Sequence, residues 1–148
     1  MKFVIQIVKS SVLSIQSKRI TQISKGMVAF VGYHHSDSPA VVHRLVNKLL
    51  QLRIFPDSNG KTNLTVHDIQ GDILCVPNFT LYADVKSSRR PSFINAAKPE
   101  VANQLFLLTK ELMIASYPRV QFGEFGADMS VEVHNDGPFT LILDSDEQ

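Results

Sequence analysis

The stretch that most constrains this chain is residues 123–140, GEFGADMSVEVHNDGPFT, in which apolar and polar side chains alternate. Met129, Val131 and Val133 are separated by single polar residues, which is the period of a β-strand with one buried face. Residues 135–138, Asn-Asp-Gly-Pro, interrupt this run, and a second alternation begins at residue 139. Gly tolerates positive φ and Pro has no N–H to donate, so the sequence predicts a turn between two strands. Because Gly followed by Pro is more than a tight hairpin needs, we also consider that this turn presents its backbone to a ligand.

The composition is typical of a globular protein. The 148 residues are 44% hydrophobic and 20% charged, which fits one domain spanning 1–148. No apolar run approaches the roughly 18 residues of a membrane span, and no secretory signal is visible, so we expect a cytoplasmic protein without membrane contact. The net charge of +1 argues against a general grip on long nucleic acid and leaves only local contacts. The single cysteine, Cys75, lies in the apolar run 73–76 and is expected to be a core thiol.

Hydrophobic periodicity predicts short strands and two main helices. The continuous apolar run 27–33 predicts a central strand covered on both faces. Ser38 and Pro39 have the pattern of an N-cap followed by proline at the first helical position. The apolar face expected for this helix consists of Val42, Leu45, Val46, Leu49 and Leu50. A second helix is predicted for 99–116, with an apolar face formed by Val101, Leu105, Leu108 and Leu112. Further strands are expected at 3–8, 12–16, 20–23 and 73–76.

Residues 77–98 form a long segment with little periodicity, which is uncommon in a compact domain and often functional. Its basic group, Lys86, Arg89 and Arg90, is suited to holding one or two phosphates, although a solvated loop explains it equally well. The aromatic residues around this group are suited to stacking a base of single-stranded RNA, and anchoring of the loop in the core is the alternative. These aromatic residues are Phe79, Tyr82 and Phe93.

Two common hydrolytic mechanisms find no support in the sequence. The chain has no G-x-S-x-G run for a serine nucleophile, and its five histidines are not at metal-ligand spacing, so no metal is expected. Thr80 is a conceivable nucleophile because it follows a buried strand, but only Asp84 is near it in sequence as a base. A Thr80 hydroxyl that hydrogen-bonds the backbone is an equally good interpretation.

Four motifs in register resemble the D-aminoacyl-tRNA deacylase family. They are FTLYAD at 79–84, RRPSF at 89–93, GEFGADM at 123–129 and NDGPFT at 135–140, and the similarity extends over nearly the whole chain. The resemblance implies an α/β fold, a three-layer β/β/α sandwich with mostly antiparallel strands and two main helices. It also implies a homodimer with the active site at the subunit interface, where a cis bond between Gly137 and Pro138 of one protomer enters the pocket of the other. No cofactor and no metal are implied.

The activity implied by the resemblance is hydrolysis of the ester between a D-amino acid and the 3′ adenosine of tRNA, with glycyl-tRNA as a further substrate. In the family the chemistry depends mainly on main-chain groups and on the 2′-hydroxyl of the RNA. The catalytic segment expected by resemblance is Pro77, Asn78, Phe79 and Thr80. The substrate-binding residues expected are Met129, Asn135, Gly137, Pro138 and Thr140, and the tRNA-binding residues expected are Lys86, Arg89 and Arg90.

Two positions differ from the usual family pattern. Pro77 and Asn78 stand where the family usually has Ser-Gln, and Ile7 stands where it usually has an Arg that is thought to help hold the Gly-Pro turn. We therefore expect weaker exclusion of L-amino acids than is usual. A related animal branch that clears L-alanine from tRNA resembles this chain at both places, so L-alanine editing is the first alternative function. The second alternative is a catalytically silent dimer that binds the tRNA 3′ end.

Overall fold

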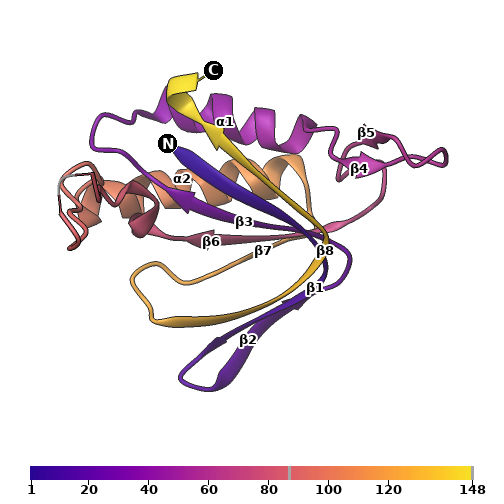
Figure 1. Ribbon diagram of the computed structural model, residues 1–148, viewed down its shortest axis with the longest axis horizontal. Helices are drawn as coiled ribbons and strands as arrows, with labels where there is room; N and C mark the ends of the chain where they lie inside the picture. The colour runs from indigo at the N-terminus through magenta and orange to yellow at the C-terminus, as the bar shows by residue number, and fades with distance from the viewer. Residues whose placement is uncertain (87, 148) are drawn as a thin grey trace.

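The computed structural model of the chain describes residues 1–86 and 88–147. A mixed sheet of six strands dominates these residues, and two α-helices cover one of its faces (Figure 1). The sheet strands are β1 (Lys2–Ile15), β2 (Lys18–Ile23), β3 (Gly26–Gly32), β6 (Asp72–Pro77), β7 (Val120–Phe122) and β8 (Met129–Asp144). The helices are α1 (Pro39–Gln51), α2 (Pro99–Ser116) and the short 3₁₀ helices η1 (Phe79–Tyr82) and η2 (Ser145–Glu147), and a small separate ribbon consists of β4 (Phe55–Pro56) and β5 (Thr62–Leu64). The predicted α/β fold with two main helices is confirmed, with a sheet that is mixed.

Strand β1 organises the sheet, because three other strands pair with it. It is antiparallel to β2, β3 and β8, whereas the β3–β6 and β6–β7 pairs are parallel. In Figure 1, β1 and β8 run side by side along their length and bend together away from the helices. The prediction of two separate strands at 3–8 and 12–16 is wrong, because register shifts around Val8 bend β1 without ending it.

The Asn-Asp-Gly-Pro segment is a bulge within β8 rather than a turn between two strands. Gln6 pairs with Thr140 and Val8 pairs with Asn135, so residues 136–139 of β8 all lie opposite the single residue Ile7. The prediction of a turn is wrong because both flanks of the segment pair with the same strand, β1, and the chain does not reverse. The Gly137–Pro138 peptide bond is cis, which agrees with the resemblance, and Gly137 has a φ of 129° that side chains rarely permit.

Both main helices begin at the predicted residues. In α1 the five predicted apolar residues are the buried ones, and Ser38 is the N-cap. In α2 the bounds agree, but its buried residues are Ala102, Leu105, Phe106, Thr109 and Met113. The predicted apolar face is wrong at Val101, which is 41% exposed. It holds for Leu105, which is buried, and for Leu108 and Leu112, which are partly buried against the core. None of the described helices is long and apolar enough to cross a membrane.

The sheet is covered on both faces by apolar side chains. Along β3, Met27 and Ala29 belong to the core beneath the helices, whereas Val28 packs in a second cluster with Leu13 of β1 and Ile23 of β2. This alternation confirms the predicted central strand. Cys75 of β6 is fully buried in the larger core, and burial raises the pKa of its thiol to about 12. It is a core thiol, as predicted.

Candidate functional site

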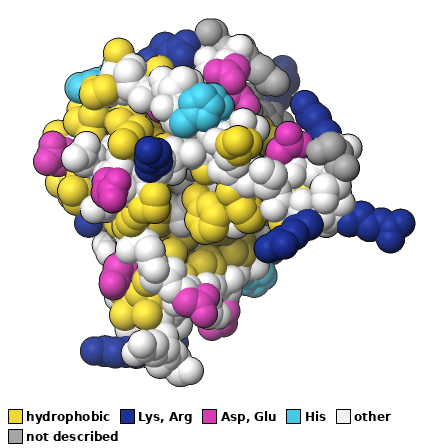
Figure 2. All heavy atoms as spheres, turned by 90° about the vertical axis from the view of Figure 1, so that its left-hand side faces the viewer, with side chains coloured by type: hydrophobic (Ala, Val, Ile, Leu, Met, Phe, Trp, Pro, Cys, Tyr) yellow, Lys and Arg dark blue, Asp and Glu magenta, His cyan; other side chains and the backbone are white. Residues whose placement is uncertain are grey.

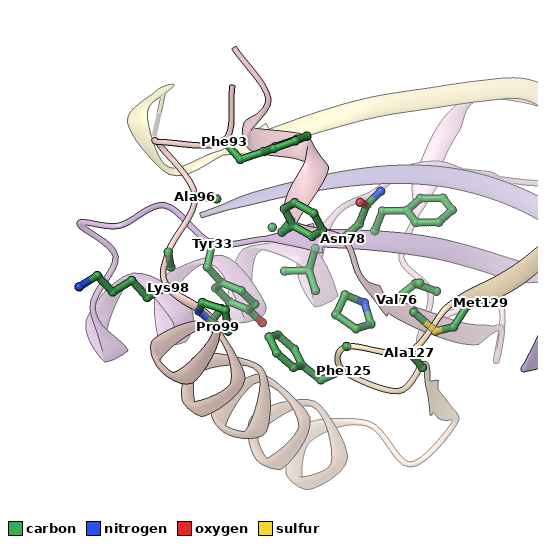
Figure 3. Close-up of a pocket in the computed structure, with 18 of the residues that line it drawn as sticks. Tyr33, Val76, Asn78, Phe93, Ala96, Lys98, Pro99, Phe125, Ala127 and Met129 are labelled. Atoms are coloured by element: carbon green, nitrogen blue, oxygen red, sulfur yellow. The ribbon is translucent and has the colours of Figure 1, made fainter. Parts of the chain in front are cut away.

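An apolar cavity of about 780 Å³ opens where β6 ends, between η1, the beginning of α2 and the loop that precedes β8 (Figure 3). Figure 2 views the left-hand side of Figure 1 and shows apolar side chains gathered on that face. The residues that line the cavity are Phe30, Val31, Gly32, Tyr33, Val76, Pro77, Asn78, Phe79, Phe93, Ile94, Ala96, Ala97, Lys98, Pro99, Ala102, Phe125, Gly126, Ala127, Met129 and Val131. Its size is within the roughly 300–1,000 Å³ of ligand pockets.

Polar side chains are sparse around this cavity. Among the described lining residues, Tyr33, Asn78 and Lys98 carry the polar side-chain atoms. Lys98 points away from the cavity, whereas Asn78 lies beside it at the end of β6 (Figure 3). A ligand that enters would therefore be held mainly by apolar contact, with orientation set by a few polar groups and by the backbone.

The expected catalytic segment lies along the edge of this cavity. Pro77 ends β6, and the Asn78 N–H donates to the carbonyl oxygen of Val31 in β3 at 2.7 Å. The side-chain oxygen of Asn78 accepts from the Thr80 N–H at 3.2 Å and from the Thr80 hydroxyl at 2.5 Å. Pro77, Asn78 and Phe79 line the cavity, and exposed Thr80 follows directly in η1.

The Thr80 hydroxyl is bound by a side chain rather than by the backbone acceptor that the sequence suggested. Its partner, the Asn78 amide oxygen, is a hydrogen-bond acceptor but not a base that removes a proton from an alcohol at neutral pH. Asp84, the one carboxylate near in sequence, accepts instead from the Lys86 N–H and pairs with Ser92. Within residues 1–86 and 88–147, the hydrogen bonds of Thr80 therefore do not include the basic partner that a nucleophile needs.

The expected substrate-binding residues fall into two places. Met129 lines the cavity with Pro77, Asn78 and Phe79. The others, Asn135, Gly137, Pro138 and Thr140, are exposed along β8 in and around the bulge and do not line the cavity of their own chain. Asp136 of the bulge lies 3.9 Å from the exposed Lys9 ammonium. The structure thus brings four expected residues together and leaves the bulge apart from them.

The basic group lies on a loop whose two ends are joined by backbone hydrogen bonds. Asp84 and Ser92 exchange two backbone hydrogen bonds, of 2.7 and 2.9 Å, at the base of the loop. Lys86, Arg89 and Arg90 are exposed, and no carboxylate of the described residues forms a salt bridge with them. Three cationic side chains on one loop next to the cavity are suited to a phosphate backbone.

The three predicted aromatic residues have two different environments. Phe79 is 58% exposed and Phe93 is 38% exposed, and their rings meet edge to face at 5.0 Å beside the cavity. Tyr82 is buried and packs on His34 with 5.3 Å between ring centroids. Base stacking therefore fits Phe79 and Phe93, while the alternative of core anchoring holds for Tyr82.

Tyr33 also lines the cavity, although no sequence pattern marked it as a site residue. The Thr109 hydroxyl of α2 donates to the Leu105 carbonyl oxygen at 2.8 Å, so its single proton is used there. The Tyr33 hydroxyl must then be the donor in its 2.7 Å bond to the Thr109 oxygen. Burial raises the pKa of Tyr33 well above its ordinary value, so the phenol stays protonated for this bond. The bond ties Tyr33, directly after β3, to α2, and no local sequence signal connects residues so far apart.

Replacing Thr109 with Val is expected to lower the free energy of unfolding by about 1–3 kcal/mol, because it leaves the buried Tyr33 hydroxyl without an acceptor. Urea denaturation measures this change. The matched double variant, Tyr33→Phe with Thr109→Val, removes both polar groups and should be less destabilised than the Thr109 variant alone. Equal stabilities of the two variants would contradict this account of the bond.

Comparisons with known proteins agree over nearly the whole chain. A family model described as D-Tyr-tRNA(Tyr) deacylase matches residues 4–144. Relatives named D-aminoacyl-tRNA deacylase include one from Thermosipho melanesiensis, 45% identical over 146 residues, which are 98% of this chain and 97% of the relative. Another, from Lactobacillus helveticus, is 44% identical over 145 residues, 97% of this chain and 99% of the relative.

Two solved structures share the fold. One, described as c-Myc DNA Unwinding Element Binding Protein, has a TM-score of 0.93 at 33% identity and covers 97% of this chain and 98% of its own. The other comes from a structural analysis of a probable eukaryotic D-amino acid tRNA deacylase and has a TM-score of 0.86 at 16% identity, covering 96% and 97%. At that identity, the second structure supports the fold alone.

Proposed function

Since this chain belongs to the D-Tyr-tRNA(Tyr) deacylase family, we propose that it is a cytoplasmic enzyme that hydrolyses the ester between a D-amino acid and the 3′ end of tRNA. Water adds to the ester carbonyl, the bond to the 3′ oxygen breaks, and the products are a free amino acid and a tRNA with its hydroxyl restored. The observation that carries the proposal is the apolar cavity that gathers Pro77, Asn78, Phe79 and Met129 within a chain of this family. The proposed role is chiral proofreading in translation, with glycyl-tRNA as a second substrate.

The aromatic residues that line the cavity support a nucleoside as the occupant. The terminal adenosine has a large planar base, and Phe79 and Phe93 offer exposed aromatic faces at the opening. In this proposal the adenosine occupies the cavity next to the catalytic segment, and the phosphates that precede it bind at the loop that carries the basic group. Lys86, Arg89 and Arg90 then contribute affinity for tRNA without selecting the amino acid.

The chemistry that fits this segment uses main-chain donors. Phe79 is the first residue of η1, and the first N–H groups of a helix have no acceptor within it. Such an N–H can stabilise the oxyanion that forms on the ester carbonyl. The hydrogen bond from Thr80 to the Asn78 amide supports this mechanism over attack by Thr80. The 2′-hydroxyl of the terminal adenosine is proposed as the group that assists the water.

A second copy of the chain completes the proposed site. The bulge at 136–139 exposes Gly137 and Pro138 but does not reach the cavity of its own chain. We assign it to the cavity of a partner protomer, in a homodimer of three-layer β/β/α subunits, where its carbonyl groups would face the amino acid. Sedimentation that shows a fully active monomer at assay concentration would contradict this assignment.

Deacylation of matched esters tests the function. D-alanyl-, glycyl- and L-alanyl-tRNA are prepared on the same tRNA and mixed with the purified protein, and release of the amino acid is followed. We expect rapid hydrolysis of the D-alanyl and glycyl esters and slower, measurable hydrolysis of the L-alanyl ester. Protection of all three esters would instead indicate the silent binder, and hydrolysis of the L-alanyl ester alone would indicate the L-alanine editing function.

Ile7 is the observation that favours relaxed chirality as the second candidate. Its side chain is 5% exposed, belongs to the main core and lies on β1 opposite the bulge, where it offers no hydrogen bond to the bulge backbone. Excluding one enantiomer requires the backbone atoms that face the amino acid to be held to within roughly half an ångström, and Ile7 provides no hydrogen bond to hold them. Ile7→Arg is a poor probe of this idea, because it would bury a charge in the core.

Replacing Arg89 and Arg90 together with Ala is expected to weaken tRNA binding and to make its salt dependence shallower. Loss of two phosphate contacts should reduce the slope of log K against log salt by roughly 1 to 2. Fluorescence titrations at several salt concentrations measure the slope. The matched control removes two exposed lysines elsewhere, Lys48 in α1 and Lys61 next to β5, and should leave the slope unchanged. Equal slopes for both double variants would make the arginines ordinary loop charges.

A further inference from the structure

The Asn78 side chain hydrogen-bonds to η1, the short helix that follows it. It is the N-cap of η1, with φ −148° and ψ 94°, and its oxygen accepts both the N–H and the hydroxyl of Thr80. Asn reaches the N–H two residues ahead of it because its side chain is short. The first turn of η1 is therefore closed by one side-chain oxygen.

The backbone of Asn78 is fixed as well. Its N–H donates to Val31 at 2.7 Å, which joins the end of β6 to β3. Gly32 allows this close approach, since a β-carbon there would lie 3.0 Å from the Asn78 carbonyl oxygen and 3.0 Å from the Leu81 β-carbon. Asn78 thus links the central sheet to Thr80, through its backbone on one side and its side chain on the other.

The state of the Thr80 hydroxyl follows from these contacts. A hydroxyl has one proton, and Thr80 donates it to Asn78 at 2.5 Å, so the oxygen has only lone pairs left to offer. Exposed Thr80 is therefore an acceptor that fits a hydrogen-bond donor on a substrate. An aminoacyl ester carries two such donors beside the scissile bond, the α-ammonium group and the ribose 2′-hydroxyl.

We propose that Asn78 is a positioning residue of the deacylase site, which acts through Thr80 by holding its hydroxyl as a hydrogen-bond acceptor toward the substrate. The inference rests on the proposed function and deepens it. Asn78 itself need not touch the reacting atoms. A residue that only stabilised η1 would act independently of the Thr80 hydroxyl, so the coupling between the two residues distinguishes the roles.

The test measures kcat and KM for a D-aminoacyl-tRNA with Asn78→Ala and Asn78→Ser, each alone and combined with Thr80→Val. Asn78→Ala should lower kcat roughly tenfold or more with little change in KM, because a misplaced group loses alignment in the transition state. Asn78→Ser should keep most of the original kcat, because a serine hydroxyl also caps helices. In the Thr80→Val background, Asn78→Ala should change kcat by less than about twofold. The control Asn59→Ala, an exposed loop asparagine distant in sequence, should behave as the unchanged protein.

Thr80 supplies an independent approach if Asn78→Ala does not fold. Thr80→Ser keeps the donated hydroxyl and should retain most of kcat, while Thr80→Val should lower it. Equal kcat values for these two variants would overturn the inference, as would equal effects of Asn78→Ala in both backgrounds or a loss confined to KM. Unchanged protein that hydrolyses no aminoacyl ester would overturn the proposed function together with this inference, whereas an active protein with independent effects overturns only the role of Asn78.

Discussion

Gly26→Ala is expected to lower the free energy of unfolding by about 4 kcal/mol or more, or to prevent folding. Gly26 begins β3 and lies between Val8 of β1 and Asp72 of β6. A β-carbon at this position would lie 1.8 Å from the Asp72 carbonyl oxygen and 2.6 Å from its amide nitrogen. Both atoms belong to the backbone of the central sheet, so neither can move aside as the end of a side chain would. Far-ultraviolet circular dichroism and urea denaturation measure the loss.

Gly60 provides the matched control. It has a φ of 76°, but a β-carbon added there would meet nothing within 4 Å, so Gly60→Ala should cost only the roughly 1–2 kcal/mol of a left-handed backbone. Similar stabilities of the two variants would show that β3 and β6 do not approach so closely in solution. The comparison also concerns the site, because β6 leads directly into Pro77 and Asn78.

Patterns that depend on neighbours in sequence predicted much of this fold. Ser38 and Pro39 marked the start of α1, and the run 27–33 marked the central strand β3, because capping and burial on both faces leave local signals. The bulge in β8 was misread because its cause is the partner strand β1, which pairs on both sides of it. Local pattern could not show that pairing.

The candidate site shows the same limit. Its irregular segment was visible as residues 77–98, but the cavity is also lined by Tyr33, directly after β3, and by Phe125 from the loop before β8. On α2, Thr109 is buried although it is polar in sequence, because its hydroxyl is satisfied by Leu105 and Tyr33. Tertiary hydrogen bonds of this kind bring distant segments together without a local sequence signal.

An ester of a D-amino acid on a terminal 2′-deoxyadenosine is expected to be hydrolysed at least about a hundredfold more slowly than the ribose ester, because a group that moves a proton in the transition state contributes on the order of 10²–10⁴. The matched control substrate carries the deoxy sugar one nucleotide earlier and should react normally. Single-turnover release of the amino acid, with enough enzyme to bind all of either substrate, measures both rates.

The same experiment on Thr80→Ala decides between the RNA and the protein as the source of the assisting group. Thr80 is poorly placed to attack, because its proton is donated to the Asn78 amide and its hydrogen bonds in the described part of the chain include no basic partner. Thr80→Ala should therefore hydrolyse the ribose ester at a reduced but measurable rate and should still discriminate against the deoxy ester. An inactive Thr80→Ala that folds and binds tRNA, beside an unchanged protein that hydrolyses the deoxy ester at the normal rate, would assign the nucleophile to Thr80. The two results separate cleanly because the 2′-hydroxyl belongs to the substrate and Thr80 to the enzyme.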